Sequence, residues 1–344
     1  MQEILGSHND DGAFTAFLEH WREVVDHRLA QAIGTIRRLD GVAGLILAGS
    51  HGAGNPWPLS DIDFLPIYRD DRADEAIEAV ERHCLAMMNE WSTQGWRTGL
   101  DIGRLRFTTG ELRRAFASGV PDPVSMLGDD RWYHSIDKGF GGRAVFDPGG
   151  LADPLARWFT RHRFDSSVVA ERLDRSVSSA MECLGNVEAC LAPGRRDLAF
   201  GHLLKAVQWQ QVHLMERWGE RDNSLGRFGA RFALAASSHG EAWLDTTLDA
   251  LSGLDETTVR RRLDLAPRWV IERKDRSWAA RRHIGEPVTE LQNDRDVLRV
   301  ATIYELRTLT SPPFPAWLGI PESDDDLRQR VHVFSDLIRL RPAH

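Results

Sequence analysis

Two aspartates, Asp61 and Asp63, stand one residue apart at the end of the stretch 48–63, AGSHGAGNPWPLSDID. In an extended strand such residues point to the same face, with Cα atoms about 6.6 Å apart. Carboxylates this close repel each other unless a cation lies between them. Mg²⁺ suits the arrangement, because it binds few carboxylates and keeps positions for phosphate oxygens. The spacing therefore predicts a Mg²⁺ site formed by Asp61 and Asp63.

A third carboxylate, Asp101, lies on the next predicted strand. Because neighbouring strands are about 4.8 Å apart, Asp101 can reach the same ions. Three carboxylates from two strands can hold two metal ions, the arrangement for in-line displacement at phosphorus. Asp122 and Glu111 are the next candidates by position if Asp101 does not serve. The competing interpretation, solvated residues at strand ends, is disfavoured because Asp is depleted in strands.

A glycine-serine pair, Gly49-Ser50, follows the apolar run VAGLILA at 42–48. Such a pair is expected to open a turn or helix, whose free backbone N–H groups and hydroxyl can hold the β- and γ-phosphates of a nucleotide. Ser60, immediately before Asp61, can fix the turn by bonding its backbone. The turn and the aspartates together predict a site for a metal-bound nucleoside triphosphate.

The elements that must position these residues follow from apolar spacing. Residues 12–39 and 71–91 are expected to be helices, and 42–48, 61–68, 99–108 and 143–146 strands, with a short helix at 110–117. Pro66 indicates that the second strand lies at a sheet edge or ends there. Beyond the Asp147–Gly150 breaker the pattern is helical in eight segments, one of them spanning 256–280.

The predicted fold class is therefore α+β. A small mixed β-sheet with flanking helices occupies residues 1–150, and an all-helical domain occupies 151–344. The first is expected to be catalytic and the second to bind the substrate, with the acceptor between them, where clefts usually form.

Composition limits the environment and the partners. No run of about 18 apolar residues exists, the N-terminus has no apolar h-region, and three cysteines stand without metal spacing, which together predict a cytoplasmic protein without a membrane partner. Residues 1–150 carry 23 acidic and 15 basic residues, whereas 151–344 carry 28 of each. Long nucleic acid is a poor partner for such an acidic surface. Lysine is rare, occurring only at positions 138, 205 and 274.

Gly49-Ser50, then Ser60-Asp61-Ile62-Asp63, then Asp101 resemble the signature of the DNA polymerase β-like nucleotidyltransferase superfamily. The approach Pro58-Leu59-Ser60 is similar to that of stand-alone bacterial members such as aminoglycoside nucleotidyltransferases. The resemblance covers about residues 40–110. It implies a metal-dependent enzyme that moves a nucleoside monophosphate from an NTP, ATP being the expected donor, to a hydroxyl with release of pyrophosphate.

In this interpretation Asp61, Asp63 and Asp101 are catalytic and bind two Mg²⁺ ions, and Asp101 also takes the hydroxyl proton. Gly49, Ser50 and Ser60 belong to the nucleotide site. The resemblance further implies a phosphate-binding basic residue on a C-terminal helix, for which Lys205 is the candidate; a snorkelling surface lysine is the alternative. The expected acceptor is a small molecule, and the resemblance implies an antibiotic-like one. A protein or tRNA acceptor, and a non-catalytic nucleotide-binding module, stay open, as does the oligomeric state.

Overall fold

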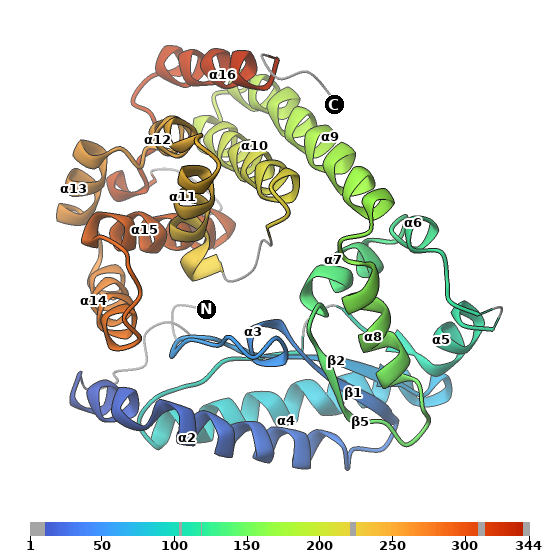
Figure 1. Ribbon diagram of the computed structural model, residues 1–344. Helices are drawn as coiled ribbons and strands as arrows, with labels where there is room; N and C mark the ends of the chain where they lie inside the picture. The colour runs from blue at the N-terminus through green and yellow to red at the C-terminus, as the bar shows by residue number, and fades with distance from the viewer. Residues whose placement is uncertain (1–10, 103–104, 118, 221–224, 309–313, 340–344) are drawn as a thin grey trace. The chain divides into compact units, whose positions relative to one another are not determined.

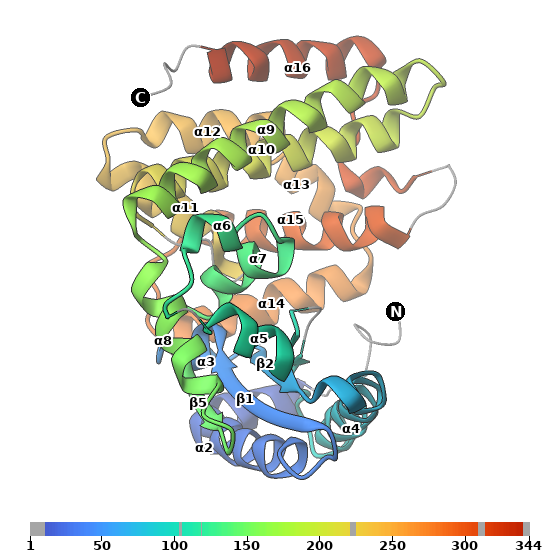
Figure 2. The same ribbon diagram turned by 90° about the vertical axis from the view of Figure 1, so that its right-hand side faces the viewer.

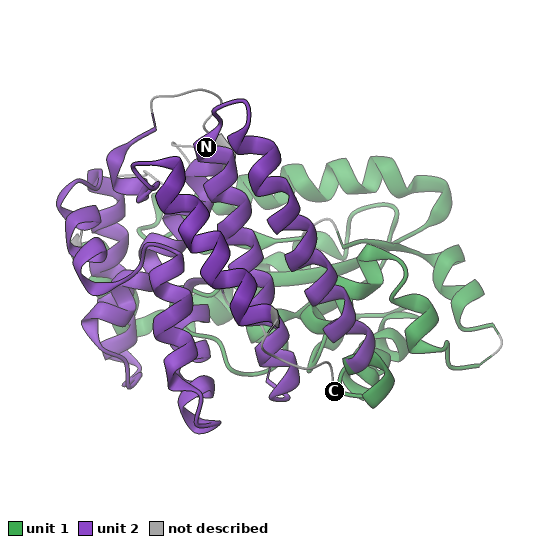
Figure 3. Ribbon diagram, turned by 90° about the horizontal axis from the view of Figure 1, so that it is seen from above, with its two compact units in different colours: residues 1–169 green, residues 170–344 purple. Residues whose placement is uncertain are grey.

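A computed structural model describes residues 11–102, 105–117, 119–220, 225–308 and 314–339. The chain divides into two compact units, residues 1–169 and 170–344, coloured separately in Figure 3. The break expected at residue 150 therefore falls inside the first unit. Residues beyond it stay with that unit because α8 (Ala152–His162) packs against the strands β1 and β5.

The first unit is built on a five-stranded mixed sheet, as expected for an α+β chain. The strands are β1 (Val42–Ala48), β2 (Ile62–Tyr68), β3 (Leu100–Asp101), β4 (Phe107–Thr108) and β5 (Arg143–Phe146). The order is β3-β2-β1-β5, with β4 also on β2. β1 runs antiparallel to β2 and β5, while β3 and β4 run parallel to β2. The apolar residues of β1 and β2 are almost fully buried, which explains their continuous apolar runs.

Helices cover both faces of this sheet (Figures 1 and 2). One face carries α2 (Asp11–Ile36) and α4 (Ala73–Thr93), which contact each other. The other carries α7 (Asp130–Lys138) and α8, whose apolar side chains share a core with Ile46, Leu65 and Phe107. Three short helices complete the unit: α3 (Gly49–Gly52), α5 (Thr109–Ala115) and α6 (Pro123–Met126). The two faces of β2 thus have different neighbours.

The expectation that Pro66 marks a sheet edge or strand end is wrong. β2 lies inside the sheet, paired with β1 along one side. On its other side β3 pairs with residues 62–63 and β4 with residues 67–68, so Pro66 falls in the gap between them. A proline lacks the N–H that a ladder needs, and the interruption removes that need on this side. The single strand expected over 99–108 is correspondingly two short strands, and residues 103–104 lie outside the described part of the chain.

The second unit is helical, as expected. Its helices are α9 (Ser166–Leu191, which begins in the first unit), α10 (Arg196–Arg217), α11 (Phe228–Ser238), α12 (Ala242–Leu251), α13 (Glu256–Asp264), α14 (Arg268–His283), α15 (Glu290–Thr308) and α16 (Asp324–Arg339). The single helix expected over 256–280 is wrong, because Pro267 caps α14 and separates it from α13. One apolar core is formed by α9, α10, α11, α12 and α16, and another by α13, α14 and α15.

Charged side chains are buried inside the second unit. Arg281 and Asp296 form a fully buried ion pair of 2.7 Å. Arg262 is 1% exposed and donates to the carbonyls of Gly253 and Trp317 and to the Thr302 hydroxyl. Burial lowers the pKa of Arg262 to about 9, so it remains charged at neutral pH. The core of this unit therefore depends on polar contacts as well as on apolar packing.

None of the helices in the described residues has the length and apolar character to cross a bilayer.

Candidate functional site

The three aspartates singled out from the sequence lie on two adjacent strands. β2 and β3 are parallel, and their register pairs Asp63 with Asp101 and Ile62 with Leu100. Ile62 is fully buried on the opposite face, so the alternation of β2 turns Asp63 toward the side covered by α7 and α8. The expected placement of Asp63 beside a carboxylate of the neighbouring strand is confirmed.

Asp61 precedes β2 and is exposed. It lies over Gly99, where a Cβ atom would stand 2.6 Å from the Asp61 Cγ. The backbone of Gly99 also accepts from the Ile62 amide at 2.9 Å, which extends the ladder by one step. Asp61 faces Gly99 as Asp63 faces Asp101, so the three carboxylates share one face of the strand pair.

Gly49 opens the turn after β1, as expected, and α3 begins at this residue. Its φ of +58° lies in the left-handed region that favours glycine. A Cβ atom here would stand 2.7 Å from the Asp63 Cγ. The turn therefore lies directly against the Asp63 carboxylate, and only glycine permits this approach.

The two serines of the motif contact each other. The Ser50 hydroxyl donates to the Ser60 hydroxyl oxygen at 3.0 Å, and the Trp57 amide donates to the same Ser60 oxygen at 3.0 Å. Ser60 thus fixes the loop between the turn and Asp61, the role expected for it. His51, next to Ser50, is buried, and burial lowers its pKa to about 4, so it is neutral at pH 7.

A lysine lies between two of the aspartates. The Lys138 ammonium, at the end of α7, is 2.9 Å from Oδ1 of Asp63 and 2.6 Å from Oδ2 of Asp101. About one fifth of the Lys138 and Asp63 side chains is exposed, against about half of Asp101. The cation that paired carboxylates require is, in this structure, an amino group of the chain itself.

Burial and charge act in opposite directions here. Burial lowers the pKa of Lys138, but the carboxylates of Asp63 and Asp101 outweigh it, so the pKa is raised overall. Burial raises the pKa of Asp63, and Lys138 opposes that rise. Lys138 therefore carries its charge at neutral pH and offsets the burial of Asp63.

The expected metal site can be compared with this geometry. Within the described ranges, no three Asp, Glu, His or Cys side chains form a group that could hold a metal ion. Asp63 and Asp101 meet at Lys138, whereas Asp61 lies over Gly99. The donors on this face are carboxylate oxygens, which suit a hard divalent cation. Asp61 and Asp63 share this face, and their role as ligands of one such ion stays a prediction.

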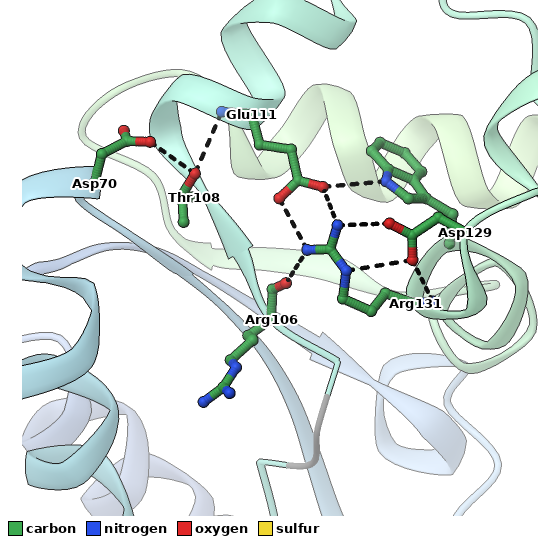
Figure 4. A network of polar contacts seen from close by, with 7 residues as sticks. Asp70, Arg106, Thr108, Glu111, Asp129 and Arg131 are labelled. Atoms are coloured by element: carbon green, nitrogen blue, oxygen red, sulfur yellow. Dashed lines mark hydrogen bonds and ion pairs between the residues drawn. The ribbon is translucent and has the colours of Figure 1, made fainter.

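The two alternative carboxylates, Glu111 and Asp122, have structural partners. Glu111 accepts from the Arg131 guanidinium at 2.8 and 3.0 Å, and Asp129 binds the same guanidinium at 2.6 Å (Figure 4). Arg131 also donates to the Arg106 carbonyl at 3.1 Å. Asp122 caps α6 by accepting from the Ser125 amide at 2.9 Å. Both acids thus hold the segment between β4 and α7 in place.

Lys205 lies on α10 in the second unit and is exposed. Its charge lowers the pKa of His202, one helical turn away, after burial, which is the larger cause. Its role as a triphosphate ligand stays a prediction.

Sequence reasoning missed Lys138 as a member of the site. The helix that carries it, α7, was not predicted, although Asp129 caps it and Trp132, Tyr133 and Ile136 have helical spacing. A further signal was available in composition. The chain has 43 Lys and Arg residues, of which three are lysine, so a lysine between two carboxylates is a rare choice. A compact ammonium fits this position better than a planar guanidinium.

Comparisons with known proteins agree in kind. The chain is 30% identical over 126 residues to a bifunctional uridylyltransferase/uridylyl-removing enzyme of Chromobacterium violaceum, over 37% of this chain and 14% of that protein. No family model matches the chain, and no solved structure matches it. The match relates part of the chain to a nucleotidyltransferase and hints at an enzyme of that general kind.

Proposed function

We propose that this protein is a nucleotidyltransferase that moves a nucleoside monophosphate from an NTP to a hydroxyl group and releases pyrophosphate. The observation that carries the proposal is the register of β2 and β3, which sets Asp63 beside Asp101. Asp63 also lies directly against the Gly49 turn. The local similarity to a uridylyltransferase supports the same class of reaction. We also propose that the first unit has the nucleotidyltransferase fold.

The turn is assigned to the triphosphate. Gly49 allows close approach of the backbone, and the Ser50 hydroxyl is oriented by Ser60 before any ligand arrives. Such preorganisation reduces the entropy that binding must overcome. Lys205 remains the proposed additional phosphate ligand, from the second unit.

Asp61 and Asp63 are assigned to a divalent cation, for which Mg²⁺ is the proposed ion. Such an ion supplies charge neutralisation and polarisation of a phosphoryl oxygen. Asp63 is held at 2.9 Å by Lys138, so its second oxygen is directed by a fixed contact. Gly49 and Gly99 leave room for the two carboxylates.

Asp101 is assigned to the acceptor. Among Lys138, Asp63 and Asp101, the Asp101 side chain is the most exposed, so it is available to a hydroxyl group. In the reaction the acceptor oxygen bonds to the α-phosphorus, and the bond from that phosphorus to the β-phosphate oxygen breaks. The hydroxyl proton passes to Asp101, and pyrophosphate leaves.

A small hydroxyl-bearing molecule is the proposed acceptor, because the acidic surplus of residues 1–150 favours a neutral or cationic partner. The uridylyltransferase similarity gives a specific reason to consider UTP beside ATP. A protein or tRNA acceptor remains the alternative to a small molecule. These are the second candidates for donor and acceptor.

The test measures binding before turnover. Calorimetry with a non-hydrolysable analogue of ATP or UTP is expected to show binding in Mg²⁺ that weakens in EDTA and in Ser50→Ala. Release of pyrophosphate is then measured with each NTP against aminoglycosides, bulk tRNA and the chain itself as acceptors. Asp63→Asn is expected to lose turnover. Asp40→Asn, a surface acid that pairs with Arg69 and Arg72, is expected to keep it. Equal analogue binding in Mg²⁺ and EDTA would refute the assignment.

A further inference from the structure

Lys138 occupies the position where a second metal ion was expected. Its ammonium bridges Asp63 and Asp101 at 2.9 and 2.6 Å, which are the two acids that would share an acceptor-side ion. A divalent cation in the same place would stand within ion-pair distance of a buried positive charge. The two cations therefore compete for one position.

The lysine is not on a flexible segment. Its neighbour Asp137 accepts from Arg163 at 2.7 Å, and the Arg163 side chain is fully buried. Further back along α7, Ile136 and Trp132 are buried in the core of the first unit. At the start of the helix, Arg131 is bound by acids of two segments (Figure 4). The backbone that delivers Lys138 is thus anchored on both sides.

The charge balance of the cluster is consistent with a permanent role. Asp63 and Asp101 carry two negative charges, and Lys138 offsets one of them. A divalent ion placed between these two acids would meet one uncompensated negative charge and an ammonium at ion-pair distance.

We propose that Lys138 is a resident cation of the site, so that the chain binds one divalent ion through Asp61 and Asp63, and the ammonium replaces a second ion between Asp63 and Asp101. This inference rests on the proposed function and revises the two-ion arrangement expected from the sequence. Lys138 is a positioning residue, since it fixes Asp101 for the acceptor.

The experiment counts ions rather than turnover. Mn²⁺ bound per chain is measured by equilibrium dialysis and electron paramagnetic resonance, with a saturating non-hydrolysable NTP analogue and a protein-free blank. Wild type is expected to bind one Mn²⁺. Lys138→Met is expected to bind two, because removal of the ammonium opens the position between Asp63 and Asp101. Lys138→Arg keeps the charge and is expected to bind one.

Lys274→Met is the matched control. Lys274 is about as exposed as Lys138 and also lies beside two carboxylates, Glu290 and Asp294, at 3.6 and 3.7 Å. It is in the second unit, and its removal is expected to leave the count at one. An added ion in Lys274→Met equal to that in Lys138→Met would overturn the inference, because the gain would then follow from any lost lysine.

The remaining outcomes separate the two proposals. Two Mn²⁺ ions on wild type would overturn the resident-cation inference and leave the proposed function intact, and this measurement does not depend on the folding of any variant. One ion on both wild type and Lys138→Met would also overturn the inference. Absence of Mn²⁺-dependent analogue binding to wild type would instead overturn the proposed function, and the inference with it.

Discussion

Replacing Gly49 by alanine tests how closely the turn lies against Asp63, and Gly54→Ala is its matched control. Both glycines have positive φ, +58° and +76°. An alanine in this conformation costs about 1–2 kcal/mol at either position. At Gly54 a Cβ atom would have no neighbour within 4 Å, so no further cost is expected there.

At Gly49 the new Cβ would stand 2.7 Å from the Asp63 Cγ, so the carboxylate must shift, which disturbs its contact with Lys138. Removing one partner of a buried ion pair costs about 3–5 kcal/mol. Because the carboxylate shifts rather than disappears, and both side chains are one-fifth exposed, we take roughly half of this, about 2 kcal/mol. Gly49→Ala is therefore expected to lose about 3–4 kcal/mol in total.

The assay is urea unfolding followed by tryptophan fluorescence, with the free energy of unfolding compared between the two variants. The extra loss in Gly49→Ala should shrink in a Lys138→Met background, because the contact it disturbs is already absent. Equal losses in Gly49→Ala and Gly54→Ala would refute the close approach of the turn to Asp63.

Three further outcomes follow from the site and from the second unit. Asp61→Asn should change the free energy of unfolding by less than about 0.5 kcal/mol because Asp61 is exposed. Asp63→Asn should lower it by about 1–3 kcal/mol because Lys138 loses a buried partner. Urea unfolding measures both values, and equal effects would contradict the pairing of Asp63 with Lys138. Asp101→Asn should keep NTP affinity but lose about 10²–10⁴-fold in single-turnover rate, and an unchanged rate would exclude Asp101 from the proton transfer. Burial and the neighbouring Asp249 raise the pKa of Asp245 to about 7, above its unfolded value of about 3.9, so its protonated form contributes stability that is fully present below about pH 4 and is lost as pH rises through 7. Asp245→Asn should remove this pH dependence, on the order of 4 kcal/mol between pH 4 and 8, from the free energy of unfolding. Parallel pH profiles of the variant and the wild type would exclude it.

Much of the fold was accessible from local sequence. The run 42–48 was expected as a strand and is β1 with the same bounds, because a continuous apolar run between a helix and a glycine has few other solutions. The mixed α+β class is also confirmed, because the apolar spacing of the other segments separates helices from strands. Pro66 led to a wrong prediction because one residue shows only that its own ladder hydrogen bond is lost. The loss is harmless because the neighbouring strand is interrupted between β3 and β4, and these segments lie far along the chain.

The candidate site divides in the same way. The shared face of Asp61 and Asp63 follows from their spacing in one strand, and the role of Ser60 follows from turn chemistry. Lys138 lies 75 residues beyond Asp63 and 37 beyond Asp101, on a nine-residue helix. Its contact with both acids exists only after α7 packs on the sheet. A pattern within one element cannot report such a contact.

The buried Arg262 has a consequence for how the second unit unfolds. Its donors are satisfied by Gly253, by Thr302 and by Trp317, which lies 55 residues away. If the segment around Trp317 detached alone, it would leave part of a charged guanidinium without acceptors inside an apolar core. Because that intermediate is costly, loss of one helix favours loss of the others. Arg262 thus couples α13, α15 and the segment before α16 into one cooperative unfolding event.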